Sequence, residues 1–214
     1  MDGIDTILFD WDGTLIDSAP YSFAAFQSAF RDLGIRLESE LYERVYSLDW
    51  YEMYHELRLP EHQWQEADDS WMYHYGKATV PLVAGGLQAL DELSRRNYCL
   101  GVVTSGSRSR VRRELSSLGL LDVFKAVVCN EDVNYKKPHP EGLLLAMEHL
   151  GKKPGACCYI GDSPEDIEMG KRANVQTIGI FSGYPNSKRL SSANPDFCVA
   201  SMAQLLSHFA SSRL

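Results

Sequence analysis

Two carboxylates lie at the end of an apolar run near the start of the chain. Asp10 and Asp12 follow Ile7–Phe9, are separated by one residue, and are followed directly by a Gly-Thr pair. This pattern predicts a buried strand whose carboxyl end presents both aspartates at a sharp exit. Because two anions there repel each other and lose hydration, we expect a cation between them, most simply a hard divalent metal with oxygen ligands. A strand followed by an ordinary Asp-Gly turn is the alternative, and these residues alone leave the two interpretations about even.

Three further expected strand ends carry groups that suit a phosphate or a metal. They are Thr104, Ser105 and Gly106 after one strand, Lys136 and Lys137 after another, and Asp162 and Asp166 after a third. Each group also has a structural interpretation: a hydroxyl before a helix usually caps it, a lysine pair is usually solvated, and Asp166 matches a capping box. Asp162 is harder to explain in this way. Ligands of a parallel sheet bind beyond the carboxyl ends of its strands, so we expect these groups to face one site.

The spacing of apolar residues predicts the elements that would position these groups. After the first strand, strands are expected near residues 99–104, 124–129, 157–160, 175–180 and 197–200, with helices between them. Such alternation implies parallel strands joined by right-handed crossovers. The predicted fold is α/β, a doubly wound parallel sheet of the Rossmann-like type that is covered by helices on both faces.

The stretch from residue 17 to about residue 80 has a different character, because its apolar residues follow only helical spacing and are unusually aromatic. Its first helix is expected from Ser18, as the cap, to Gly34. A later helix face carries Trp64, Ala67, Trp71 and Tyr75. We expect this face to pack inside a small bundle rather than to stack on a ligand. The chain therefore divides into an α/β core of residues 1–16 and 81–214 and an inserted all-helical segment of residues 17–80.

Composition and charge argue against several kinds of partner and cellular location. The 214 residues carry 21 basic and 29 acidic side chains, a net charge of −8, which argues against a nucleic-acid or anionic-membrane surface but allows a local phosphate pocket. No run approaches the roughly 18 apolar residues of a membrane span, and the acidic N-terminus does not resemble a signal peptide. The five cysteines fall in expected buried strands without metal-ligand spacing, which predicts reduced core residues. We therefore expect a cytoplasmic protein.

The strand-end residues together resemble the sequence pattern of the haloacid dehalogenase superfamily of phosphohydrolases. That pattern has a strand with Asp-x-Asp-Gly-Thr, a strand ending in Thr or Ser, a Lys before Pro, and a Gly-Asp-x-x-x-Asp after a further strand. The matching segments are Asp10–Thr14, Thr104–Gly106, Lys137-Pro138 and Gly161–Asp166. The run PLVAGGLQALDEL also resembles the return to the core after the helical cap of the phosphoglycolate phosphatase and beta-phosphoglucomutase group. The inserted helical segment would then be a cap domain.

The resemblance implies a Mg²⁺-dependent phosphohydrolase that acts on a small phosphate monoester, like phosphoglycolate phosphatase, through an aspartyl phosphate. Asp10 would be the nucleophile, and Asp12 would be the general acid and base. Mg²⁺ would be bound by Asp10, the backbone carbonyl of Asp12, and Asp162. Trp11 is bulkier than expected between the aspartates, and strand alternation predicts that it points to the opposite face.

The phosphate-binding groups follow from the same resemblance. They would be Thr104, Ser105, Gly106 and Lys137, with Thr104 and Lys137 also counted as catalytic. Asp166 would support this site by orienting Lys137 or the metal environment. We prefer Lys137 to Lys136 because Pro138 fixes the backbone beside it. In the cap, the loop near residues 46–51 together with Arg44 or His55 would select the substrate.

Three other functions share parts of this pattern. A dehalogenase works without Mg²⁺ and lacks the second aspartate, so Asp12 and Asp162 argue against it. A beta-phosphoglucomutase-like phosphomutase would keep every catalytic residue, and the core motifs do not separate it from a phosphatase. A non-enzymatic phospho-receiver domain also uses an acidic cluster, a hydroxyl and a lysine, but it has no use for a helical insertion of about 60 residues. The expected partner is a small phosphorylated metabolite, with no nucleic acid or membrane, for a monomer or homodimer.

Overall fold

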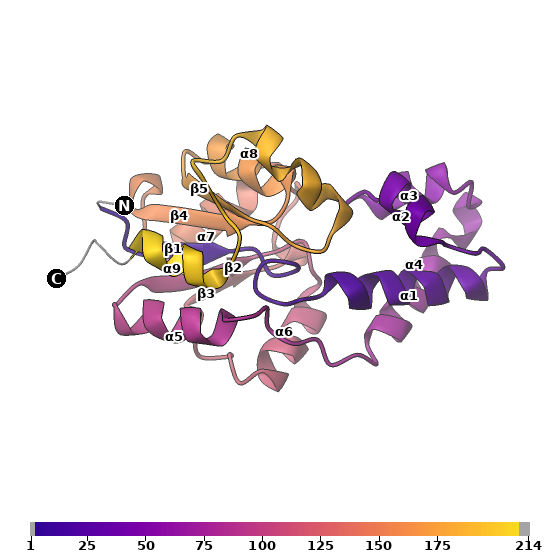
Figure 1. Ribbon diagram of the computed structural model, residues 1–214, viewed down its shortest axis with the longest axis horizontal. Coiled ribbons are helices and arrows are strands. Elements are labelled where there is room, and N and C mark those ends of the chain that lie inside the picture. The colour runs from indigo at the N-terminus through magenta and orange to yellow at the C-terminus, as the bar shows by residue number, and fades with distance from the viewer. Residues whose placement is uncertain (1–2, 210–214) are drawn as a thin grey trace.

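The computed structural model describes residues 3–209, in which six strands form one parallel sheet (Figure 1). The strands are β1 (Thr6–Phe9), β2 (Cys99–Val103), β3 (Ala126–Val128), β4 (Cys157–Gly161), β5 (Gln176–Ile180) and β6 (Phe197–Val199). Their order is β3-β2-β1-β4-β5-β6, and every neighbouring pair is parallel. The predicted α/β doubly wound fold is confirmed. Because β1 lies between β2 and β4, the residues that follow these three strands meet at one edge of the sheet.

Helices cover both faces of the sheet. On one face lie α5 (Gly86–Arg95), α6 (Arg108–Ser117) and α9 (Met202–Phe209), and on the other lie α7 (Glu141–Leu150) and α8 (Pro164–Arg172) (Figure 1). Side chains along β1 alternate between two buried clusters. Ile7 and Phe9 belong to the cluster that includes residues of α5, α6 and α9, whereas Leu8 belongs to the cluster under α7 and α8. Burial on both faces explains why β1 is apolar at nearly every position.

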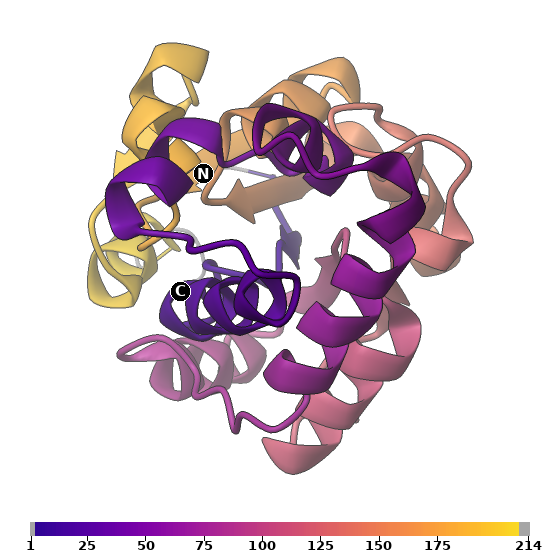
Figure 2. The same cartoon turned by 90° about the vertical axis from the view of Figure 1, so that its right-hand side faces the viewer.

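The segment between β1 and α5 is helical throughout its regular structure. It contains α1 (Ala19–Asp32), α2 (Ser39–Val45), α3 (Trp50–Glu56), the short 3₁₀ turn η1 (Glu61–Gln63) and α4 (Trp64–Tyr75). These helices gather to one side of the sheet, where α1 and α4 pack against each other (Figures 1 and 2). The ring of Trp71 lies 4.5 Å from the rings of Trp50 and Tyr75 and 5.6 Å from that of Phe26. Trp71 therefore packs inside the helical group, as its helix face predicts.

Some local expectations were wrong. Ser18 precedes α1 but does not cap it, because its Oγ shares a hydrogen bond of 3.0 Å with the hydroxyl of Tyr184. Cys198 is exposed rather than buried, because it lies on β6 at the edge of the sheet. The 3₁₀ helix η4 (Pro185–Ala193), between β5 and β6, was not predicted from the apolar pattern. Shorter 3₁₀ turns are η2 (Asn130–Asp132) and η3 (Pro154–Ala156).

Among residues 3–209, every helix is too short or too polar to cross a bilayer.

Candidate active site

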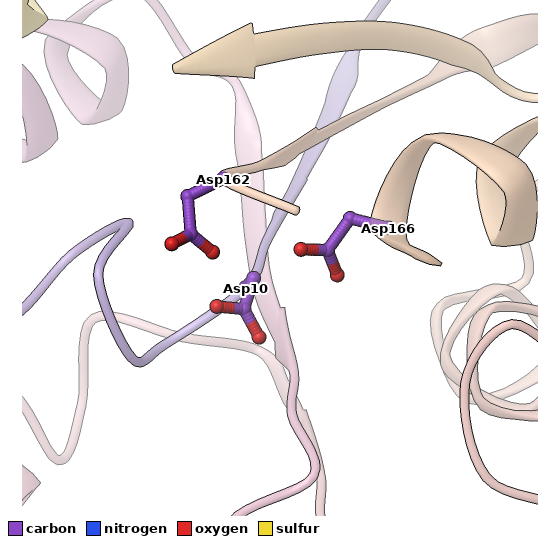
Figure 3. A group of neighbouring side chains, drawn as sticks. All are labelled: Asp10, Asp162 and Asp166. Atoms are coloured by element: carbon purple, nitrogen blue, oxygen red, sulfur yellow. The ribbon is translucent and has the colours of Figure 1, made fainter. Parts of the chain in front are cut away.

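Three aspartates from separate parts of the chain meet in one buried cluster. Asp10 follows β1, Asp162 follows β4, and Asp166 lies in the first turn of α8 (Figure 3). One carboxylate oxygen from each lies within 4.8 Å of the others. An all-oxygen donor set of this size fits a hard divalent cation such as Mg²⁺. The structure thus brings together two of the predicted metal-binding side chains, Asp10 and Asp162, and adds Asp166 beside them.

The cluster is electrostatically unfavourable even with Lys137 beside it. Burial raises the pKa of Asp10 to about 7, against the opposing effect of Lys137 and with further repulsion from Asp166 and Asp12. Burial also raises the pKa of Asp162 well above its usual range, and the charges of Asp10 and Asp166 add to this rise. A divalent cation would stabilise the ionised carboxylates that burial disfavours.

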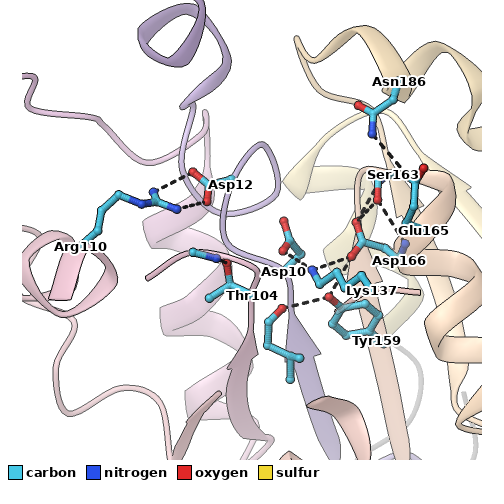
Figure 4. A network of polar contacts seen from close by, with 12 residues as sticks. Asp10, Asp12, Thr104, Arg110, Lys137, Tyr159, Ser163, Glu165, Asp166 and Asn186 are labelled. Carbon is cyan, nitrogen blue, oxygen red and sulfur yellow. Dashed lines mark hydrogen bonds and ion pairs between the residues drawn. The ribbon is translucent and has the colours of Figure 1, made fainter. Parts of the chain in front are cut away.

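Lys137 lies between two of these carboxylates. Its Nζ donates to Oδ1 of Asp10 at 2.5 Å and to Oδ1 of Asp166 at 2.7 Å (Figure 4). Burial opposes the charge of Lys137, but the attraction of Asp10 and Asp166 outweighs it and raises the lysine pKa well above its usual range. Lys136 is exposed to solvent. The structure therefore brings to the cluster the lysine that was preferred from the sequence.

Asp166 makes contacts of both kinds that the sequence left open, to the start of the helix and to the lysine. Its Oδ2 accepts hydrogen bonds from the backbone N–H and the Oγ of Ser163, and Ser163 Oγ accepts one from the Asp166 N–H, which is a capping box for α8. Its Oδ1 accepts from Lys137 and lies 3.0 Å from the hydroxyl of Tyr159. Oδ2 thus takes part in the capping box of α8, while Oδ1 accepts the hydrogen bond from the lysine. Tyr159 was missed, because a tyrosine in the middle of a buried strand gives no sign of a polar partner.

The loop after β2 turns tightly beside the cluster. Thr104 is buried, and its Oγ1 accepts a hydrogen bond of 2.9 Å from the backbone N–H of Gly106. Ser105 is exposed. The residue that precedes α6 is Ser107, so Thr104 is not the cap of that helix. This arrangement leaves the polar groups of residues 104–106 at the same edge of the sheet as Asp10.

Asp12 points away from the aspartate cluster and toward α6 (Figure 4). Its two carboxylate oxygens accept hydrogen bonds from Nη1 and Nη2 of Arg110, at 3.0 and 2.5 Å. Nη1 of Arg110 also lies 3.3 and 3.2 Å from the two carboxylate oxygens of Glu114. Glu114 accepts a further hydrogen bond of 2.7 Å from the indole N–H of Trp11, which is fully buried and meets Phe124 edge to face. Arg110 was not predicted from the sequence, because an arginine four residues before a glutamate usually forms an exposed helix pair.

The two candidate substrate-selecting residues lie in a separate hollow. Arg44 and His55 line a cavity of about 870 Å³ that is bounded by the α2–α3 loop and by Glu165, Asn186 and Arg189. Of the described residues that line it, none belongs to the aspartate cluster. Tyr46 also lines the cavity, and its ring lies 5.6 Å from that of Tyr184. The loop predicted near residues 46–51 therefore does border a large cavity, next to the site rather than inside it.

The sheet is doubly wound, and beyond its central strands lie buried aspartates, a lysine and a loop that carries hydroxyl groups. These features together define an α/β enzyme of the phosphate-transfer type. A family model described as haloacid dehalogenase-like hydrolase matches residues 7–180. The chain belongs to this family, and relatives named phosphatase or pyrophosphatase identify it as a phosphatase. This result sets aside the non-enzymatic receiver domain.

Relatives with assigned names cover nearly the whole chain. Pyrophosphatase PpaX from Oceanobacillus iheyensis is 30% identical over 213 residues, which is 95% of this chain and 95% of that protein. Phosphoglycolate phosphatase from Yersinia pseudotuberculosis is 31% identical over 217 residues, which is 94% of this chain and 90% of that protein.

Solved structures show the same fold. A haloacid dehalogenase-like family hydrolase from Streptococcus pneumoniae superposes with a TM-score of 0.85 at 23% identity, over 98% of this chain and all of that chain. A hydrolase from Pseudomonas syringae gives a TM-score of 0.82 at 25% identity, over 96% of this chain and 97% of that chain. Both similarities extend over the sheet and the helical segment together.

Proposed function

We propose that this chain is a Mg²⁺-dependent phosphohydrolase that acts on a small phosphate monoester through an aspartyl phosphate, in the manner of phosphoglycolate phosphatase. The observation that carries the proposal is the environment of Asp10, which lies buried at the end of the central strand, beside Asp162 and in contact with Lys137. A buried carboxylate beside a cation is suited to attack phosphorus, because it needs no separate base once it is ionised.

The proposed reaction has two steps. Asp10 attacks phosphorus and forms an acyl phosphate, while the carboxyl group of Asp12 gives its proton to the departing oxygen of the substrate. Water then attacks the acyl phosphate, Asp12 accepts a proton from that water, and inorganic phosphate leaves with Asp10 restored. Thr104 and Lys137 would hold the phosphoryl oxygens through both steps. Mg²⁺, held by Asp10, Asp162 and the Asp12 carbonyl, would supply positive charge that offsets repulsion between Asp10 and the phosphate.

The helical segment would act as a cap. We propose the domain division of residues 1–16 and 81–214 as core and residues 17–80 as cap, because the helices α1–α4 lie together beyond the site. A cap of this kind excludes bulk water and contacts the leaving group. Within it, Arg44 and His55 remain candidates for substrate selection through the adjoining cavity.

The substrates named for two relatives support a small, negatively charged substrate. Phosphoglycolate and pyrophosphate are both small phosphate compounds whose leaving group carries a further negative charge. We infer that this chain acts on a compact substrate of the same general kind rather than on a polymer.

The test is phosphate release from p-nitrophenyl phosphate with Mg²⁺. We expect Asp10→Asn to abolish turnover, because the amide is neither a nucleophile nor an anionic metal ligand. Asp17→Asn is a matched control, because Asp17 is exposed and lies in the same loop region. Turnover by Asp10→Asn at the wild-type rate would refute the nucleophile assignment. The same assay with beta-glucose 1-phosphate separates the two enzyme classes, since a mutase would yield glucose 6-phosphate instead of free phosphate.

A further inference from the structure

Arg110 is a buried cation at the edge of the candidate active site for which the proposed reaction has no role. Its guanidinium lies against the loop after β2, where a Cβ added at Gly106 would overlap it. The side chain is only 6% exposed. Burial opposes its charge, but the carboxylates of Asp12 and Glu114 outweigh this and raise the pKa of Arg110 well above its usual range. A permanent positive charge therefore lies beside the phosphate-binding loop.

The two carboxylates around Arg110 differ in how firmly they are held. Glu114 lies one turn further along α6, is buried, and is also bound by the indole of Trp11. Asp12 lies in the loop after β1, and its side chain is 25% exposed. Glu114 is thus the more firmly held partner of Arg110, and Asp12 is the partner that solvent reaches.

Asp12 is held away from the reaction by this ion pair. Both of its oxygens accept hydrogen bonds from Arg110, yet the proposed reaction needs one of them at the leaving oxygen of the substrate. When Asp12 turns toward the substrate, Arg110 loses two charged hydrogen bonds in a buried place. That loss is unfavourable unless another anion replaces the carboxylate.

We propose that Arg110 binds a second anionic group on the leaving side of the substrate, and that this group displaces Asp12 toward the leaving oxygen. The inference rests on the proposed function and names its substrate class: a small phosphate ester or anhydride whose leaving group carries a carboxylate or a phosphate. The planar fork of a guanidinium matches either group with two parallel hydrogen bonds. Arg110 is then the residue that determines specificity.

A second donor lies beside Arg110. The ring centre of Tyr75 is 5.3 Å from the guanidinium carbon, and the tyrosine side chain is buried. Its hydroxyl donates to no acceptor of the described chain, and the charged group beside it is the guanidinium of Arg110. An anion held by Arg110 would give the proton of this hydroxyl an acceptor, and a buried donor without an acceptor costs free energy.

The experiment compares two substrates that differ only in the proposed anion. Phosphoglycolate carries a carboxylate where 2-hydroxyethyl phosphate carries a neutral hydroxymethyl group, and kcat/KM is measured for both with Mg²⁺. For the wild-type protein we expect phosphoglycolate to be preferred by roughly 100-fold, the size of effect that follows the loss of a buried charge pair. In Arg110→Gln this ratio should fall to within a few-fold of unity, and Arg110→Lys should give an intermediate ratio, because lysine keeps the charge without the fork.

Several controls make the result decisive. Both substrates are measured on the same preparation, so an inactive fraction of a variant cancels from the ratio, and Arg110→Gln/Glu114→Gln avoids leaving Glu114 buried without its partner. Arg112→Gln, an exposed arginine of the same helix, should keep the wild-type ratio. An equal loss of kcat/KM on both substrates in Arg110→Gln, or a wild-type ratio near unity, would overturn the inference.

Binding separates this inference from the proposed function. Calorimetric titration of the two compounds into Asp10→Asn protein with Mg²⁺ measures their binding affinities without turnover. We expect phosphoglycolate to bind more tightly than 2-hydroxyethyl phosphate. If the wild-type protein released no phosphate from any ester, the proposed function would fail, and the calorimetric comparison alone would decide for or against the role of Arg110.

Discussion

At the scale of single residues, the site depends on how closely the loop after β1 approaches the end of β4. Gly13 lies in this loop with a φ of 79°, a left-handed conformation that side chains rarely adopt. A Cβ at this position would overlap the carboxylate of Asp162 and the ring of Tyr184. Glycine is therefore required here both by the backbone and by the carboxylate of Asp162 that packs against it.

Gly13→Ala and Gly34→Ala separate these two requirements. Gly34 has a φ of 77°, but a Cβ there meets nothing within 4 Å. We expect Gly34→Ala to lower the free energy of unfolding by about 1–2 kcal/mol, the cost of a left-handed alanine, with little effect on activity. Gly13→Ala should cost more and also raise the Mg²⁺ concentration needed for half-maximal activity, because Asp162 must move. Thermal unfolding and Mg²⁺ titration of the two variants check this, and identical behaviour would show that the contact with Asp162 has no consequence.

Some of these residues were predictable from the sequence and others were not. Asp10, Asp162 and Lys137 each follow a predicted strand, and topology alone brings such positions to one edge of the sheet. The pairing of Arg110 with Asp12 depends instead on the rotamer of a helix residue 98 positions away from its partner in the chain. Apolar periodicity carries no information about a contact of that kind. The roles assigned to all of these side chains remain predictions.

At the scale of elements, α8 shows how a helix start can also build a site. Pro164 begins the helix, and the capping box between Ser163 and Asp166 fixes its first turn. The same turn presents the second oxygen of Asp166 to Lys137. The sequence predicted the strands and helices because their apolar periodicity is strong. It did not predict η4, whose 3₁₀ turns follow no such period, or the hydrogen bond of Ser18 with Tyr184, which depends on tertiary packing.

Ser163→Ala and Asp166→Asn test the two functions of this turn separately. Ser163→Ala removes the cap but leaves the carboxylate for Lys137, so we expect a loss of about 1 kcal/mol in the free energy of unfolding and less than about a tenfold loss in kcat/KM. Asp166→Asn keeps a side chain able to cap α8 but removes the charge beside Lys137. Its kcat/KM should fall by roughly 10- to 100-fold, as expected for a lost hydrogen bond between charged groups. Denaturant unfolding and steady-state kinetics measure both quantities, and the reverse ranking of the two variants would contradict the division of roles.

At the scale of the whole molecule, the acidic cluster would link the binding of a metal ion to stability. The chain carries a net charge of −8, and its buried aspartates concentrate negative charge where water cannot solvate it. The folded protein therefore favours either a proton or a cation at this place. Protons and a bound Mg²⁺ would compete for the same oxygens, so metal binding here should depend on pH.

The stabilisation by Mg²⁺ should consequently be larger at pH 8 than at pH 5. Burial raises the pKa of Asp10 from 3.8 to about 7 and shifts that of Asp162 in the same direction. Between pH 3.8 and about pH 7, the folded state therefore binds more protons than the unfolded state. The metal-free protein thus loses stability as pH rises through this window, and above it the ionised cluster gains most from the cation. We expect the difference in Tm between samples with Mg²⁺ and with EDTA to be roughly 5 °C greater at pH 8 than at pH 5. Groups outside the cluster contribute equally with and without Mg²⁺ and cancel from this difference. Asp10→Asn should reduce this pH dependence but not abolish it, because Asp162 remains buried. An equal gain in Tm at both pH values in the wild-type protein would show that Mg²⁺ does not bind at these carboxylates.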